Sequence, residues 1–184
     1  MTFEDILGDG RLWAVVYEED KINILSKLFS QWQDPEYLYG FFSEHKNDLF
    51  SYFRVTDIAQ AIYDTGQDAN MLKAVILDLN PDTHLDYLLF KPLENSRISE
   101  MTLSKEKAKG RRLSGHPSWL RIYALKFEPD SYLITGGAIK LTRTMEERSH
   151  TLQELVRLEQ VRNFLLEQGA VDLDGFIEYN TLTN

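Results

Sequence analysis

The sequence predicts an α+β fold in which an N-terminal strand and several helices pack on a small antiparallel sheet with a C-terminal helix. Three observations predict it. A short apolar, β-branched run at 12–17 indicates a strand, and apolar residues recur at helical spacing between residues 22 and 79. Two further strand-like runs, 119–127 and 132–141, flank a turn. We expect a single domain over residues 1–184, with a helical insertion at about 57–110.

The composition excludes several classes of protein. Hydrophobic residues make up 43% of the chain and aromatic residues 12%, which argues against a mainly disordered chain. No apolar run approaches the roughly 18–20 residues that span a bilayer, and residues 1–5 do not resemble a secretory signal. The chain has no cysteine, so disulfides, thiolate metal sites and a cysteine nucleophile are excluded. We therefore expect a cytoplasmic protein with no membrane partner.

The net charge of −9 is unevenly distributed along the chain. Residues 1–101 hold 8 Lys/Arg and 18 Asp/Glu, residues 102–162 hold 12 and 7, and residues 163–184 add four acids and no base. Phosphates respond to a local field, so a basic middle segment can bind them even in an acidic protein. Lysines and arginines that merely cover solvated faces would give the same pattern. Charge alone leaves both interpretations open.

Four helices are expected before the main hairpin. The first covers 22–32 and ends at Asp34-Pro35, where proline suits the first turn of the next helix. The second carries one apolar stripe from Leu38 to Phe53. The pair Thr56-Asp57 supplies the expected N-cap of the third helix, and Asp68 that of the fourth.

The segments before the hairpin are less regular. Residues 85–93 are ambiguous between helix and an extended segment that ends at Lys91-Pro92. Residues 99–109 have a strongly polar, helix-like pattern, and a loop rich in Arg, Ser and His follows at 110–117.

The predicted hairpin has a clear alternation. Leu120, Ile122 and Ala124 share one face of its first strand, and Arg121 and Tyr123 lie on the other. The pair 136–137, Gly-Gly, predicts a bulge or a sharp coil in the second strand.

The last helix is predicted to begin at Thr151, with Glu154 at the capping-box position, and to end at Gly169. Residues 176–179 are apolar enough for a small terminal strand.

No standard catalytic motif is present. The sequence has no phosphate loop, dinucleotide fingerprint, zinc-protease motif or nucleophile elbow, and its four histidines have no metal-ligand spacing. Residues 172–175, Asp-Leu-Asp-Gly, match part of a calcium loop, but the downstream ligands are missing, which favours an ordinary acidic turn. We expect neither a metal nor a cofactor.

Basic and aromatic side chains are interleaved between residues 105 and 140. RNA cleavage through the 2′-hydroxyl needs a proton acceptor, a proton donor and cations for the crowded phosphorane, and it needs no metal. The candidate catalytic residues are Lys107, Arg112, His116 and Arg121. The candidate RNA-binding residues are Lys105, Lys109, Arg111, Trp119, Tyr123 and Lys140. The alternative interpretation is a surface loop whose arginines pair with the acidic first half of the chain.

The segment from Trp119 onward resembles the RelE/HigB-like toxins of bacterial toxin–antitoxin systems. The resemblance lies in the strand 121–126, Arg-Ile-Tyr-Ala-Leu-Lys, the strand 132–141, Tyr-Leu-Ile-Thr-Gly-Gly-Ala-Ile-Lys-Leu, and a helix with Glu154-Leu155. It covers about a third of the chain. It implies a ribosome-dependent endoribonuclease that cleaves mRNA, in which Arg121 and Lys140 match the family's basic residues. It also implies a cognate antitoxin as partner, of the helix-turn-helix class.

The chain departs from these toxins in being long and acidic, and its helices at 57–79 and 99–109 look like additions to the scaffold. A second hypothesis is therefore a non-catalytic interaction protein on the same scaffold. Its docking patch would be drawn from the aromatic residues Phe41, Phe42, Phe50, Tyr52 and Phe53.

Overall fold

The computed structural model describes residues 1–93, 103–110 and 116–183. The strands in these ranges form one six-stranded sheet in the order β1-β2-β6-β5-β4-β3. Neighbouring strands are antiparallel, except that β2 and β6 are parallel. The strands are β1 (Thr2–Asp5), β2 (Leu12–Val16), β3 (Phe90–Pro92), β4 (Ser104–Lys109), β5 (Leu120–Glu128) and β6 (Ser131–Ile139). The predicted α+β class, with an N-terminal strand in a mostly antiparallel sheet, is confirmed.

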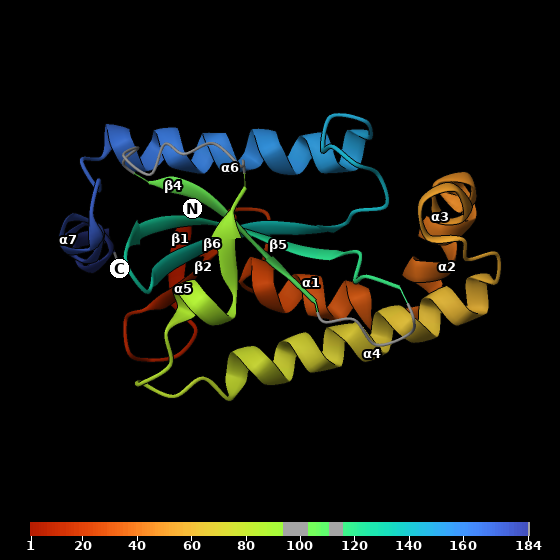
Figure 1. The fold of residues 1–184 in the computed structure, drawn as a ribbon. Helices are drawn as coiled ribbons and strands as arrows, with labels where there is room; N and C mark the ends of the chain where they lie inside the picture. The colour runs from red at the N-terminus through yellow and green to blue at the C-terminus, as the bar shows by residue number, and fades with distance from the viewer. Residues whose placement is uncertain (94–102, 111–115, 184) are drawn as a thin grey trace.

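Helices cover both faces of the sheet (Figure 1). α6 lies along one face, α1 and α4 lie on the other, and α2 with α3 stands at one end of the molecule, away from α7. α1 contacts β6 and β2, and α4 packs across α1 and α2. The helices are α1 (Ile24–Trp32), α2 (Pro35–Glu44), α3 (Lys46–Phe53), α4 (Ile58–Leu77), α5 (Leu85–Leu88), α6 (Ser149–Glu167) and α7 (Leu173–Thr183).

The strand expected first is the second strand of the sheet. β1 precedes it and pairs with it from Thr2↔Val16 to Asp5↔Trp13. The Asp5 carboxylate accepts hydrogen bonds from the backbone N–H groups of Leu7, Gly8 and Gly10, which closes the turn between the two strands. β1 was missed because Phe3 is its only buried residue, so it carries almost no apolar pattern.

The expected helix starts at Asp34 and Asp57 are confirmed. Each carboxylate accepts from two backbone N–H groups of the first turn, and Pro35 follows directly as the first residue of α2.

Two helix boundaries were predicted wrongly. The stripe from Leu38 to Phe53 is split at His45 into α2 and α3, and each half keeps its own buried residues. The third and fourth helices are one helix, α4, which runs through Gly66. Asp68 is therefore no N-cap; its carboxylate is buried and accepts the Ser118 hydroxyl.

The segment 99–109 was also predicted wrongly. Residues 94–102 lie outside the described part of the chain, and 104–109 form β4 rather than a helix. The reason is its pairing: β4 lies between β3 and β5, and Glu106 and Ala108 face the buried side. The segment 57–110, expected as a helical insertion, thus contributes β3 and β4 to the sheet.

The β5–β6 hairpin forms as predicted, with its turn at Pro129-Asp130. Tyr123 pairs with Gly136 and Ala124 with Ile134, so Thr135 is the extra residue of a bulge beside the glycine pair. Gly137 has no room for a side chain, since a Cβ there would lie 2.6 Å from the Arg121 carbonyl oxygen.

The predicted capping box of the last helix is wrong. α6 begins at Ser149, and the Thr151 hydroxyl bonds the carbonyl oxygens of Met145 and Arg148. The Glu154 carboxylate instead accepts the N–H of Gly137 at 3.0 Å. The predicted break at Gly169 is confirmed by its φ of 75°.

The chain ends in a helix and not in the expected strand. Phe176 of α7 is fully buried and makes edge contacts with Phe3 and Trp13. The Asp172 carboxylate accepts the Gly175 N–H, which makes 172–175 the start of this helix. In the described part of the chain, no three metal-binding side chains come together.

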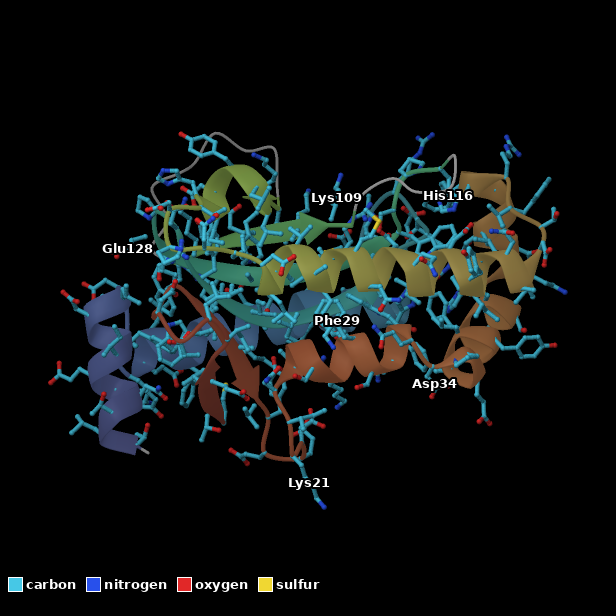
Figure 2. The ribbon with its side chains drawn as sticks, turned by 90° about the horizontal axis from the view of Figure 1, so that it is seen from below. Lys21, Phe29, Asp34, Lys109, His116 and Glu128 are labelled. Carbon is cyan, nitrogen blue, oxygen red and sulfur yellow. The ribbon has the colours of Figure 1, made fainter. Side chains whose placement is uncertain are left out.

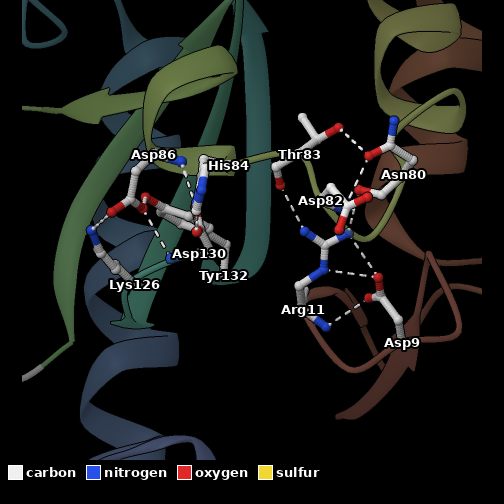
Figure 3. Close-up of polar contacts among 10 residues, drawn as sticks. All are labelled: Asp9, Arg11, Asn80, Asp82, Thr83, His84, Asp86, Lys126, Asp130 and Tyr132. Atoms are coloured by element: carbon white, nitrogen blue, oxygen red, sulfur yellow. Dashed lines mark hydrogen bonds and ion pairs between the residues drawn. The ribbon is translucent and has the colours of Figure 1, made fainter.

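Two polar networks fix the end of the sheet that carries the β5–β6 turn (Figure 3). Asp86 accepts from Lys126 at 2.7 Å and from the Tyr132 hydroxyl, while Arg11 donates to the backbone carbonyl of Thr83. These contacts join the α5 region to the β5–β6 hairpin and to the turn between β1 and β2. None of the helices in the described ranges combines the length and apolar character that crossing a membrane requires.

Candidate functional site

A cavity of about 460 Å³ lies on the face of the sheet that α6 covers. β4 and β5 line it together with the start of the β6–α6 loop and one residue of α6 itself. Five cationic side chains of the described residues line it: Lys107, Lys109, Arg121, Lys140 and Arg143. Glu146 is the one carboxylate among its described lining residues.

Strand register brings these side chains together. Lys109 pairs with Arg121 across β4 and β5, and Lys107 pairs with Tyr123. Because side chains alternate along a strand, these four lie on one face of the sheet. On β6 the opposite residues are Ala138 and Gly136. The Glu154 carboxylate of α6 occupies the place where a side chain at Gly136 would lie.

Three of the cavity cations donate to backbone carbonyl oxygens. Lys107 donates to the Leu93 carbonyl at 2.7 Å, and Lys140 to that of Thr142 at 2.6 Å. One guanidinium nitrogen of Arg121 donates to the carbonyls of Ser118 and Leu120.

Among the described residues, none of the five cavity cations forms an ion pair with a carboxylate. Carbonyls orient a cation but do not neutralise it. The cavity is therefore a local concentration of positive charge in an acidic protein.

The pKa values reflect this crowding. Burial lowers the pKa of Lys107, and the charges of Lys109 and Arg121 lower it further. The Arg121 charge is the main cause that lowers the pKa of Lys109. Burial, followed by the Arg121 charge, lowers the pKa of Lys140. A bound anion would relieve this repulsion and raise all three pKa values.

Tyr123 adds a polar group that lacks a partner. Its side chain is 1% exposed, and its hydroxyl has no hydrogen-bond partner among the residues that the structure describes. Burial raises the pKa of this hydroxyl, so it stays protonated and can donate. Buried hydroxyls are nearly always bonded, and an orphan one beside a cavity marks a place where a ligand can supply the acceptor.

The loop that lines the cavity is fixed to α3. Arg148 donates to both carboxylate oxygens of Asp48 at 2.6 Å, and the Tyr52 hydroxyl bonds Glu147 at 3.1 Å. The bidentate pair lowers the pKa of Asp48. These contacts hold residues 142–146 against the cavity.

His116 and Trp119, predicted for the same site, lie elsewhere. The His116 ring stacks on Trp119 with centroids 4.2 Å apart, and its Nε2 lies 3.3 Å from an Asp64 carboxylate oxygen. Trp119 is buried and donates to the Thr65 hydroxyl of α4. Both are therefore on the α4 side of the sheet, and Figure 2 places His116 at the α3 end, away from Lys109. The structure therefore does not bring His116 or Trp119 to the cavity.

The remaining predicted residues divide as follows. Lys105 forms an ion pair with Glu159 of α6 and does not line the cavity. Arg111 and Arg112 lie outside the described residues. The sequence argument missed Arg143 and Glu146, which follow Lys140 closely in the chain; their nearness to that lysine was the available signal.

The aromatic patch of the second hypothesis is smaller than expected. Phe42 is fully buried, and Phe41 and Phe53 are half-buried against the core. Phe50 and Tyr52 remain exposed.

No family model matches the chain, and neither does any curated protein or solved structure. A functional proposal for this chain therefore depends on the geometry and charge of the cavity.

Proposed function

We propose that the protein is a metal-independent endoribonuclease of the RelE/HigB-like type, with its active site in the cationic cavity. The observation that supports this is the convergence of Lys107, Lys109, Arg121 and Lys140 on one cavity, where no carboxylate of the described residues forms an ion pair with them. An RNA phosphodiester is an anion of the kind that such a set binds through charge-assisted hydrogen bonds.

The proposed reaction divides the roles among residues that line the cavity. Glu146 accepts the proton of the 2′-hydroxyl, and the 2′-oxygen attacks the phosphorus. The bond to the 5′-oxygen breaks, and Lys107 donates a proton to that oxygen. The products are a 2′,3′-cyclic phosphate and a 5′-hydroxyl end. Arg121 and Lys109 stabilise the charge of the phosphorane.

Lys107 suits the role of proton donor because burial and two neighbouring cations lower its pKa. A general acid works best when its pKa lies near the working pH. Arg121 suits electrostatic stabilisation because a guanidinium stays charged and presents a planar fork to phosphate.

The same proposal includes the partner and the compartment. A cognate antitoxin, of the helix-turn-helix class, binds the protein in the bacterial cytoplasm and blocks the cavity. The substrate is mRNA at the ribosome. The acidic helical side of the chain keeps non-specific RNA binding weak.

Expression of the chain alone in bacteria tests this proposal. We expect growth arrest with the wild type and relief with Lys107→Ala. Lys73→Ala is the matched control, because Lys73 is an exposed lysine on α4, across the sheet from the cavity. It should arrest growth as the wild type does.

Normal growth at good expression of the wild type would contradict the nuclease. It would favour the non-catalytic interaction protein, for which Phe50 and Tyr52 are the exposed aromatic residues. Relief by both lysine variants alike would also contradict a role for the cavity.

A further inference from the structure

The cavity has an apolar side as well as a cationic one. Tyr123 and Met145 belong to a small apolar cluster beside the main core, and Leu93 and Leu155 pack against it. All four also line the cavity. A site for a bare phosphate needs only the cations, so the apolar wall indicates a ligand with a second, apolar part.

Tyr123 connects the two sides. Its ring belongs to the apolar cluster, while the charge of Arg121 acts on its hydroxyl and lowers its pKa against the effect of burial. Among the described residues, three buried polar side-chain atoms have no hydrogen-bond partner, and this hydroxyl is the one that belongs to a residue lining the cavity. A ligand that supplies it with an acceptor must therefore place a polar atom between the apolar wall and the cations.

The size of the cavity sets the size of the ligand. Small-molecule pockets have volumes of about 300–1,000 Å³ and combine apolar walls with a few placed polar groups. At about 460 Å³ this cavity falls at the lower end of that range. Such a volume suits one compact ligand and leaves no room for a run of stacked bases.

We infer that the cavity is a single-nucleotide site: its cations take one phosphate, and the base packs against Leu155, Met145 and the Tyr123 ring. The Tyr123 hydroxyl then donates to a phosphate oxygen, and the ribose lies between the phosphate and the base. This inference rests on the proposed function and deepens it, because it states which part of an RNA chain enters the cavity. Bases pack on aromatic and apolar surfaces regardless of sequence, so one wall can accept more than one base.

Titration calorimetry with the full chain and three ligands tests the inference. The ligands are uridine 3′-monophosphate, ribose 5-phosphate and inorganic phosphate. We expect the nucleotide to bind at least tenfold more tightly than ribose 5-phosphate. Leu155→Ala should reduce that ratio about fivefold and leave the affinity for inorganic phosphate unchanged.

Leu152→Ala is the matched control. Leu152 lies on the same helix, is 41% exposed and does not line the cavity. It should leave all three affinities unchanged. Unfolding measured in parallel confirms that each variant is folded, and Leu155→Met serves as a second variant if Leu155→Ala fails to fold; it should lower the ratio by less.

The outcomes separate this inference from the nuclease. Equal affinities for the nucleotide and ribose 5-phosphate would overturn the single-nucleotide site, even if RNA is cleaved. A base-dependent affinity that is sensitive to Leu155→Ala would support the site, even if no RNA is cleaved. Absence of binding by all three ligands would overturn the inference as well.

Discussion

At the scale of single residues, the unpartnered hydroxyl of Tyr123 is the feature that most distinguishes the cavity from an ordinary packing defect. A buried hydroxyl without a hydrogen bond costs stability, by about 1–3 kcal/mol in mutational data. The fold retains it at 1% exposure beside Arg121 and Lys107. A group that costs stability in the free protein and lies among cations is best explained by a bound anion.

Tyr123→Phe should therefore have opposite effects on stability and binding. The free energy of unfolding should stay constant or rise by about 1 kcal/mol, because the lost hydroxyl has no partner. The affinity for a phosphate ligand should fall about tenfold, because a hydrogen bond to a charged group is lost. Chemical denaturation and calorimetry measure the two effects.

Tyr132→Phe is the control for this prediction. Tyr132 is equally buried, but its hydroxyl is bonded to Asp86. Its loss should lower stability and leave the affinity for phosphate unchanged. A Tyr123→Phe variant that behaves as Tyr132→Phe does would remove the support for an anion beside Tyr123.

Sequence alone predicted part of the site at this scale. Strand alternation placed Arg121 and Tyr123 on one face, and the structure agrees. It could not place His116, whose partner Asp64 is 52 residues away on α4. His116 lies on the α4 side of the sheet because of that tertiary contact, which no local sequence pattern indicates.

At the scale of secondary-structure elements, the end of β6 depends on Glu154. β2 pairs with β6 only as far as Ile134, so the N–H of Gly137 points toward no strand on that side. The Glu154 carboxylate accepts this N–H and also an Arg157 hydrogen. Burial raises the pKa of Glu154 above that of an ordinary glutamate.

Glu154→Gln should make the stability less dependent on pH. The folded state binds the Glu154 proton more tightly than the unfolded state, so the wild type has this contribution at acid pH and loses it as the pH rises through the raised pKa. The stability of the wild type relative to Glu154→Gln should therefore fall between acid and neutral pH. Denaturation across that range measures it, and a difference that rises with pH would contradict the account.

Gly137→Ala and Gly66→Ala should have opposite effects on stability. A Cβ at Gly137 would meet backbone and Leu28, so we expect a loss of about 1–3 kcal/mol. A Cβ at Gly66, inside α4, would meet nothing within 4 Å, and alanine there should add about 0.5–1 kcal/mol. Thermal unfolding measures both, and a tolerated Gly137→Ala would contradict the close approach at the bulge.

Local sequence signals predicted helix caps and turns correctly but did not predict the strand β4. Asp34-Pro35 and the 128–131 turn were sufficient because capping and turn chemistry act within a few residues. The polar segment 104–109 became a strand because β3 and β5 pair with it on both sides. The pattern of apolar and polar residues within a segment does not indicate which distant strands will pair with it.

At the scale of the whole molecule, the division of charge along the sequence is also a division in space. The basic segment supplies β4, β5 and the β6–α6 loop, whose cations meet on the α6 face. His116 and the buried Asp64 and Asp68 belong to the opposite face, with α4. RNA cleavage on the α6 face and cleavage on the His116 face therefore predict different effects of mutations.

The central claim is that the cavity on the α6 face, and not the His116 face, cleaves RNA. The most direct test is the cleavage of a reporter mRNA in a bacterial cell-free translation reaction, with Arg121→Ala and His116→Ala compared at equal concentrations of folded protein. Arg121→Ala should reduce the cleavage rate at least a hundredfold, since one electrostatic stabiliser of this kind contributes about 10²–10³ in rate. His116→Ala should cleave at a rate within about threefold of the wild type, because a residue outside the active site contributes nothing to transition-state stabilisation. Loss of cleavage in His116→Ala, with Arg121→Ala still active, would contradict the account.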